Sequence, residues 1–200
     1  MRIIAGRWRG TRLATPEGET TRPTAGRARE AVFSMLESGR FDHPVHGNPL
    51  AAAVVADVFA GSGALGLEAV SRGAGRGMRQ VLFLEQDKTA LAVLDANIKR
   101  LRLGDAAAVL AVDATAPLRW PAAAAGLFLI DPPWQHSAAA PDLADLALQR
   151  LLAAGAIASG ALVVLEHDKR FPPAGSCGFS LLESRSWGRI GCSFLRHEKG

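Results

Sequence analysis

The amino-acid sequence predicts an α/β fold built on a doubly wound, mostly parallel sheet of seven strands. Between residues 54 and 167, near-continuous apolar segments of strand length alternate with segments of helical periodicity, as expected for a parallel sheet covered on both faces. A glycine-rich turn follows the first of these apolar segments and opens a helix, which is typical of nucleotide-binding sheets. The last two apolar segments are joined by only a few residues around Gly188, too few for a crossover, so the last strand should be antiparallel.

The individual elements follow from apolar periodicity. A helix is expected over residues 24–38, where Ala28, Val32, Met35 and Leu36 share one face and Thr24 is the expected N-cap. Residues 43–49 should form a loop, and the glycines of residues 1–24 suggest a short hairpin-like extension. Strands are expected at 54–59, 80–85, 108–113, 127–131, 161–167, 179–184 and 189–197, with helices at 64–73, 87–101 and 142–153.

Composition narrows the class of protein. The chain has 200 residues, 48% of them hydrophobic, which suits one globular domain with a small appendage. No apolar run approaches the roughly 20 residues that a membrane-spanning helix needs, and the N-terminus has no apolar stretch typical of a secretory signal. Cys177 and Cys192 lie far apart without a CxxC pair, which argues against zinc and against a disulfide framework. We therefore expect a cytoplasmic monomer that binds neither membrane nor metal.

Positive charge is concentrated at the N-terminus. Residues 1–16 hold Arg2, Arg7, Arg9 and Arg12 and no acid, whereas the rest of the chain balances at 19 bases against 19 acids. Nineteen of the 23 basic residues are arginine, which pairs with phosphate through a bidentate fork and stacks on bases. A solvated basic surface is one interpretation, but the arginine bias and Trp8 favour a nucleic-acid-binding arm. We divide the chain into a basic, RNA-facing extension and helix over residues 1–40 and a catalytic domain over residues 41–200.

The glycine-rich turn admits two nucleotide-like ligands. Gly61, Gly63 and Gly66 satisfy the G-x-G-x-x-G pattern, and Glu85 lies 19 residues beyond the third glycine, at the end of the next predicted strand. This pattern fits a dinucleotide, with Glu85 on a ribose diol. S-adenosylmethionine is the competing ligand.

Charge favours S-adenosylmethionine. Its sulfonium and ammonium outweigh its one carboxylate, whereas a dinucleotide brings a negatively charged pyrophosphate. Four acids end or follow successive predicted strands at the edge where such sheets bind ligands: Asp57, Glu85, Asp113 and Asp131. An acidic rim would attract the sulfonium and repel a pyrophosphate. The sequence also contains no tyrosine, a common proton donor in carbonyl reduction.

Each of these acids also has a structural interpretation. Asp57 could cap the backbone amides of the glycine turn, and Glu85 could be a solvated strand end. Asp113, expected to contact the adenine amino group, is the weakest of the four because only an unremarkable Ala-Thr follows it.

A rigid segment follows the fourth predicted strand. The sequence "LFLIDPPW" ends an apolar run with Asp131, Pro132, Pro133 and Trp134. Prolines cannot donate to a sheet, so the strand must end there, and the backbone beyond it is stiff. The Asp131 carboxylate and the Pro132 carbonyl could accept the two hydrogens of an exocyclic amine and aim its lone pair at a methyl donor, while Trp134 could stack on the base. We call Asp131 to Trp134 the ledge; its structural interpretation is a strand-terminating turn with a packing tryptophan.

Together, the ledge, the "DVFAGSGALGLEA" loop and the N-terminal "MRIIAGRWRG" and "TRPTAGRAREAVFSML" segments resemble the RsmD-type methyltransferases. The resemblance runs from Met1 to about His167. It implies a Rossmann-like, class I S-adenosylmethionine-dependent enzyme that methylates N2 of a guanine in small-subunit (16S) ribosomal RNA, free or in the assembling subunit. Two positions depart from the family pattern, because Trp134 replaces a smaller aromatic residue and Val112 replaces a glycine before Asp113.

The resemblance assigns the site residues. The implied catalytic residues are Asp131, Pro132, Pro133 and Trp134. The implied cofactor-binding residues are Asp57, Ala60, Gly61, Ser62, Gly63, Glu85, Gln86, Asp113 and Ala114. The predicted RNA-binding residues are Arg7, Arg9 and Arg12, from the charge of the arm, and Arg22, Thr24 and Arg27, which the resemblance places with Arg29 at the mouth of the site.

Three alternatives remain open. A protein glutamine methyltransferase uses a similar ledge, but a peptide substrate gives no reason for the arginine arm. A DNA adenine-N6 methyltransferase would need more chain outside the sheet to read a duplex. A non-catalytic RNA-binding protein would not need an intact glycine loop and ledge. His136 and His167 are not assigned to the site, since a strand-end histidine is more often satisfied by backbone groups.

Overall fold

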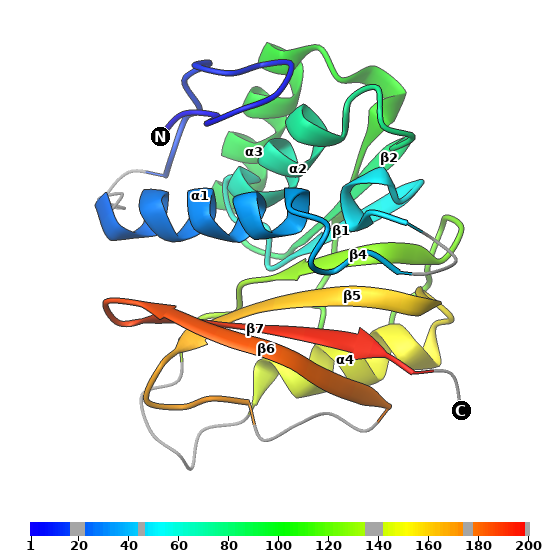
Figure 1. Ribbon diagram of the computed structural model, residues 1–200. Helices are drawn as coiled ribbons and strands as arrows, with labels where there is room; N and C mark the ends of the chain where they lie inside the picture. Colours follow the sequence, from blue (N-terminus) through cyan, green and yellow to red (C-terminus); the bar gives the residue numbers. More distant parts are fainter. Residues whose placement is uncertain (17–22, 44–46, 135–141, 174–177, 199–200) are drawn as a thin grey trace.

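The predicted α/β architecture is confirmed by the computed structural model, which describes residues 1–16, 23–43, 47–134, 142–173 and 178–198 (Figure 1). Seven strands form one sheet in the order β3-β2-β1-β4-β5-β7-β6. They are β1 (Val54–Val58), β2 (Gln80–Glu85), β3 (Ala107–Ala111), β4 (Ala125–Ile130), β5 (Ile157–Asp168), β6 (Phe179–Trp187) and β7 (Ile190–His197). The pairs from β3 to β5 are parallel, and β7 is antiparallel to both of its neighbours, as the short connection at Gly188 predicted.

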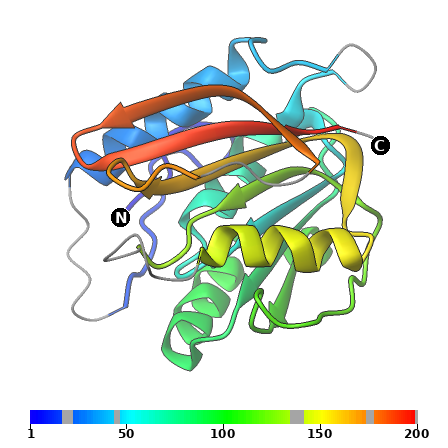
Figure 2. The same ribbon diagram turned by 90° about the horizontal axis from the view of Figure 1, so that it is seen from below.

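Helices cover both faces of the sheet. They are α1 (Pro23–Glu37), α2 (Ala64–Gly73), α3 (Lys88–Leu101) and α4 (Leu143–Ala153), with short 3-10 turns at Pro49–Ala51 and Gly104–Ala106. Side chains of α1, α2 and α3 pack into one apolar layer with alternate strand residues. Side chains of α4 and of residues 118–122 form the layer on the other face. Figure 2 shows α1 and α4 on opposite sides of the sheet. The helices that follow β1 and β2 therefore lie on one face and the helix that follows β4 on the other, which is the doubly wound arrangement.

Several expected boundaries differ from the structure by a few residues, and two of these differences have a clear physical reason. Thr24 lies inside α1 rather than capping it, because the helix already begins at Pro23. Proline suits the first helical position, since its missing N–H would have no intrahelical partner there. The fifth strand begins at Ile157, before the predicted residue 161, and its pairing with β4 shifts register between Ala125 and Leu127. The shift spans Gly160, at a positive φ of 73°, and such an irregularity carries no apolar signal.

The N-terminal residues form a hairpin-like loop that packs on the sheet domain, as expected. Arg2 and Arg12 form an antiparallel bridge, and Ile3 and Leu13 are buried in the same apolar layer as α1 and α2. Gly6 lies against the Ser71 carbonyl, where an added Cβ would come within 2.1 Å of the oxygen, so only glycine fits. The boundary near residue 40 and the RNA-facing role of residues 1–40 remain predictions.

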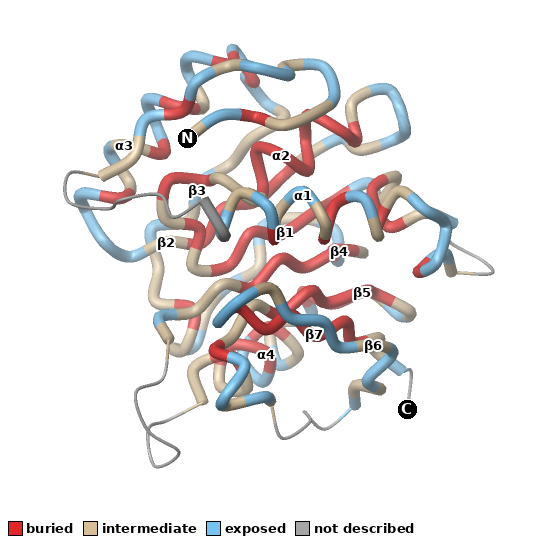
Figure 3. Tube along the Cα trace, turned by 60° about the vertical axis from the view of Figure 1, so that its left-hand side comes forward, coloured by how far each residue is buried: buried red, intermediate tan, exposed pale blue. Residues whose placement is uncertain are grey.

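Burial is deepest along the middle of the sheet. β1, β4 and the centre of β5 are almost fully buried, whereas β6 at the edge is largely exposed (Figure 3). In the described part of the chain, no helix is both long and apolar enough to cross a membrane.

Candidate active site

A cleft of about 500 Å³ opens at the carboxyl edge of the parallel strands. It is formed by the ends of β1, β2 and β4 together with the chain start. Its lining residues are Met1, Asp57, Phe59, Ala60, Gly61, Ser62, Ala64, Leu65, Glu85, Gln86, Asp87, Asp131, Pro132, Pro133 and Trp134. The structure thus brings the glycine loop and the whole ledge into one cleft, although 65 positions separate Gly66 from Asp131 in the sequence.

Backbone geometry explains the glycines of the loop. Gly61 and Gly63 have positive φ angles of 55° and 81°. A Cβ on Gly63 would lie 2.5 Å from Cδ1 of Leu94, and one on Gly66 would lie 2.5 Å from Cε1 of Phe83. At Gly61, by contrast, no described atom lies within 4 Å of the Cβ position, so its backbone is open to the cleft. Gly63 and Gly66 are therefore required because a side chain would clash with the core, whereas Gly61 leaves room for a ligand.

Asp57 is buried beneath the loop, with 1% of its surface exposed. Its Oδ2 accepts a 2.7 Å hydrogen bond from the Gly66 amide at the start of α2. Burial raises the pKa of Asp57 well above its usual value, and the nearby Asp131 and Glu85 carboxylates raise it further. Asp57 therefore caps the amide of the turn, as its structural interpretation anticipated, and its contact with a cofactor remains a prediction.

Glu85 holds the other side of the loop. Its Oε2 accepts from the Gly61 amide at 2.7 Å, and its Oε1 accepts from the Gln86 and Asp87 amides at 2.8 Å each. A carboxylate has about four acceptor positions, so capacity remains for a ligand hydroxyl. Glu85 is consequently fixed at the cleft wall before any ligand binds.

Three predicted cofactor residues do not line this cleft: Gly63, Asp113 and Ala114. Asp113 accepts hydrogen bonds from the Thr115 amide and hydroxyl, which lower its pKa, and Ala114 is buried in the layer beneath α4. Their contact with a cofactor also remains a prediction.

The ledge begins where β4 ends. The Asp131 amide donates to the Val58 carbonyl at 3.2 Å, so the aspartate is still attached to the neighbouring strand when the prolines begin. The guanidinium carbon of Arg189 lies 5.3 Å from the centre of the Trp134 ring. Since Arg189 covers one face of the indole, a base would have to stack on the other.

Glu166 is a site-adjacent residue that sequence reasoning missed. Leu165 on β5 pairs with Ile130 on β4, so Glu166 is the neighbour of Asp131, and it pairs with Cys192 on β7. Burial, and secondly the charge of Asp131, raise the pKa of Glu166 to about 8, while the positive charge of Arg29 acts in the opposite direction. Like the other acids it stands near the end of an apolar strand, and this signal could have identified it.

His167, next in the chain, is held between the Asp168 carbonyl and the Ser193 hydroxyl, each 3.0 Å from a ring nitrogen. Its exclusion from the site remains a prediction, and His136 lies outside the described residues.

The predicted RNA-binding arginines lie on the surface. Arg7, Arg9, Arg12 and Arg27 are exposed, whereas Arg22 and the Thr24 side chain lie outside the described part of the structure. Their RNA contacts remain predictions.

Side chains of α2 and α3 hold the N-terminal hairpin in place. The Glu68 carboxylate accepts from the Ile4 and Ala5 amides at 2.8 and 3.0 Å, and the Ser71 hydroxyl accepts from the Trp8 amide at 3.1 Å. Asn97 links the hairpin to the glycine loop by donating to the carbonyls of Ala14 and Ser62. The arm is therefore fixed beside the cleft rather than free.

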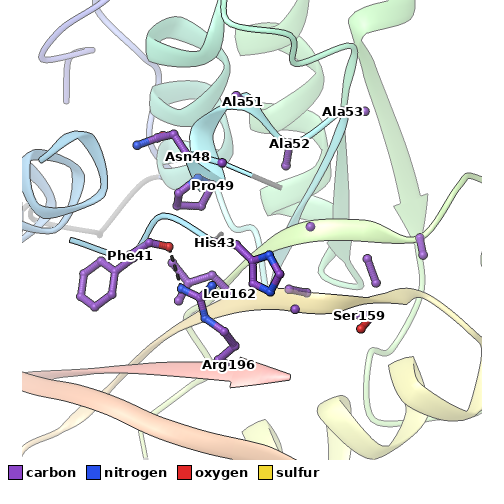
Figure 4. Close-up of a pocket in the computed structure, with 16 residues that line it drawn as sticks. Phe41, His43, Asn48, Pro49, Ala51, Ala52, Ala53, Ser159, Leu162 and Arg196 are labelled. Atoms are coloured by element: carbon purple, nitrogen blue, oxygen red, sulfur yellow. Dashed lines mark hydrogen bonds between the residues drawn. The ribbon is translucent and has the colours of Figure 1, made fainter. Parts of the chain in front are cut away.

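A second pocket, of about 260 Å³, lies at the opposite edge of the sheet, where the parallel strands begin (Figure 4). Its walls are largely alanine and glycine, and the Arg196 guanidinium beside it donates to the Phe41 carbonyl at 2.6 Å. It contains none of the predicted site residues, and open parallel sheets bind ligands at the other edge.

Comparison with known proteins agrees with this geometry. The family model described as "Conserved hypothetical protein 95" matches residues 1–196. The chain is 32% identical over 168 residues to "Ribosomal RNA small subunit methyltransferase D" of Escherichia coli K12, which covers 84% of this chain and 75% of that protein. It is 31% identical to the protein of the same name from Haemophilus influenzae, over 95% of this chain and 90% of the relative. The solved structure of Escherichia coli yhhF superposes with a TM-score of 0.75 at 29% identity, covering 100% of this chain and 99% of that one.

Proposed function

We propose that this chain, which belongs to the RsmD family of ribosomal RNA small-subunit methyltransferases, transfers a methyl group from S-adenosylmethionine to the N2 amine of a guanine in small-subunit ribosomal RNA. One observation carries the proposal: the ledge and the glycine loop line the same acidic cleft. The names of the relatives support the RNA substrate, and the ledge suits a planar substrate with an exocyclic amine.

The cleft fits S-adenosylmethionine. The carboxylates of Glu85 and Asp131 line it, and none of its described lining residues is a lysine or arginine. Such a lining favours a ligand of net positive charge and disfavours a pyrophosphate. Gly61 offers open backbone, and Glu85 retains capacity for a ribose hydroxyl. When bound, S-adenosylmethionine supplies an electrophilic methyl group.

The ledge would orient the target amine. A guanine N2 is a poor nucleophile because its lone pair is delocalised into the ring. In the proposed mechanism, the Asp131 carboxylate and the Pro132 carbonyl accept its two hydrogens, hold the lone pair towards the methyl group and stabilise the positive charge that develops on nitrogen. The methylated nitrogen is acidic while cationic, so a proton leaves it without a strong base.

Asp131→Ala tests this role. Loss of one preorganised acceptor should lower the rate of methyl transfer about 10²- to 10³-fold, with little effect on cofactor affinity. The assay follows methyl transfer to small-subunit ribosomal RNA, both as naked RNA and in the assembled subunit, with cofactor binding measured by calorimetry. Asp105→Ala is the matched control, because Asp105 is exposed in the turn that precedes β3.

Mass mapping of the product identifies the modified atom. N2-methylguanosine is the expected product, and methyl groups on adenine N6 or on a protein glutamine would contradict the proposed substrate. If Asp131→Ala transfers methyl groups at the wild-type rate, the ledge is only a structural turn.

A further inference from the structure

A buried carboxylate beside the cleft holds two arginines at the surface. Asp168 is the last residue of β5, and its side chain has 0% of its surface exposed. Its Oδ2 accepts from Arg170 Nη2 at 2.8 Å and from Arg189 Nε at 2.7 Å. The two arginine side chains are about half exposed, at 55% and 49%. We call Arg170 and Arg189 the Asp168-held pair.

The pair is fixed on aromatic rings as well as on Asp168. The guanidinium carbon of Arg189 lies 5.3 Å from the Trp134 ring centre, and that of Arg170 lies 5.3 Å from the Phe171 ring centre. The Lys169 amide donates to the Arg189 carbonyl at 3.0 Å, which ties the loop after β5 to the turn between β6 and β7. Both arginines are thus held in one geometry without any ligand.

The pair keeps unused hydrogen-bonding capacity. Arg189 contacts Asp168 through Nε, and within the described residues its two Nη groups have no hydrogen-bond partner. Arg170 likewise keeps Nη1 without a partner in that part of the chain. One carboxylate balances two guanidiniums, so the cluster of Asp168, Arg170 and Arg189 by itself carries a net positive charge. Half-exposed guanidiniums that are positioned in advance suit phosphate oxygens, which they bind bidentately.

The position of the pair relates it to the substrate. Arg189 stacks on Trp134, a ledge residue that lines the cleft. The N-terminal arginines lie on the other flank, because their hairpin is fixed on α2 and α3. Figure 1 shows the chain start and the β6–β7 turn at the same edge of the sheet, the first above β1 and β4 and the second below them. An RNA strand that crosses the cleft would meet arginines on both sides.

We propose that Arg170 and Arg189, held by Asp168, bind the RNA backbone next to the target guanine, on the side of the cleft opposite the N-terminal arginines. This inference rests on the proposed function and adds a second phosphate-binding element to it. Asp168 is a positioning residue here, since it acts through the two arginines. The alternative is that the pair only braces the loops at this end of the sheet.

The double variant R170Q/R189Q tests the proposal. It should weaken binding to purified small-subunit ribosomal RNA at least about tenfold, because two phosphate contacts are lost. The slope of log affinity against log salt should become shallower by about 1.5, from 0.7–0.9 per contact. In methyl transfer, KM for RNA should rise more than kcat falls, and cofactor affinity should stay at the wild-type value.

The chain offers a closely matched control. Arg100 in the last turn of α3 and Arg185 on the edge strand β6 are both exposed. The variant R100Q/R185Q removes the same charge from two arginines that do not line the cleft, so it should retain the RNA affinity and salt slope of the wild type.

A second variant separates charge from folding. R170K/R189K keeps both positive charges but loses the planar guanidinium that binds phosphate bidentately. The slope of log affinity against log salt should therefore stay close to that of the wild type. A folded R170Q/R189Q with wild-type RNA affinity and slope would overturn the inference, as would a lysine variant with the shallow slope of the glutamines. If the wild type itself neither binds nor methylates the RNA, the proposed function falls together with the inference. If it does both and the double variant matches it, only the inference falls.

Discussion

Glu166 should make the stability of this protein fall as pH rises. The pKa of its carboxyl is about 8 in the folded protein against a usual 4.5, because burial and the charge of Asp131 disfavour the ionised form. Between these two values the folded chain holds a proton that the unfolded chain has released, so unfolding becomes easier with increasing pH. Across this interval the free energy of unfolding falls by about 1.36 kcal/mol for every pH unit. The total loss is about 5 kcal/mol at pH values above 8.

Glu166→Gln removes the titrating carboxyl, and with it this pH-dependent loss of stability, while it keeps the shape of the side chain. The charged and titratable groups around Glu166 are Asp131 at the end of β4, Arg29 on α1 and Cys192 on β7. The variant should match the wild type near pH 4.5 and be more stable by several kcal/mol near pH 9. The difference should grow steadily in between.

Urea unfolding at intervals from pH 4.5 to 9 measures this difference. Glu198→Gln, at an exposed glutamate beyond β7, is the control, and its curve should stay parallel to that of the wild type. If the curves of Glu166→Gln and wild type are parallel as well, Glu166 is ionised in the folded state and the reasoning is refuted.

Three further predictions concern the glycine loop, the N-terminal anchor and the arm. Gly66→Ala should cost about 1–3 kcal/mol of unfolding free energy and weaken cofactor binding, because its Cβ would lie 2.5 Å from Phe83 Cε1 and 2.9 Å from Asp57 Oδ2. Gly26→Ala in α1 meets no described atom within 4 Å and should be neutral or stabilising in the same urea titration. Glu68→Ala should lower the free energy of unfolding by about 3–5 kcal/mol, because the Ile4 and Ala5 amides and the buried Arg72 would lose the carboxylate that they contact. A loss below about 1 kcal/mol would contradict this account. Replacing Arg7, Arg9 and Arg12 by glutamine should weaken RNA binding and flatten its salt dependence at unchanged cofactor affinity, and wild-type values in anisotropy titrations would show the arm to be only a solvated surface.

The sequence predicted most of the fold because strand and helix periodicities are local signals. Apolar runs placed all seven strands, and the short connection at Gly188 predicted the antiparallel last strand. The sequence-based prediction misplaced Thr24 and the start of β5. The start of α1 depends on a single proline, and the start of β5 depends on a register shift, and neither is visible as periodicity. Boundaries of this kind carry little local information.

For the candidate site too, some features follow from the sequence and others only from the tertiary structure. The sequence alone determined which chemical groups are present: acids at strand ends, glycines where the backbone turns sharply, and a stiff ledge after β4. Only the tertiary structure decided which of these meet. It brought the ledge and the glycine loop into one cleft, left Asp113 outside the lining, and set Glu166 beside Asp131 through the pairing of β4 with β5. It also joined Asp168, Arg170 and Arg189 into one cluster beside Trp134. These partners come from strands and loops distant in the chain, and sheet register fixes their contacts, so no local pattern of residues could have specified them.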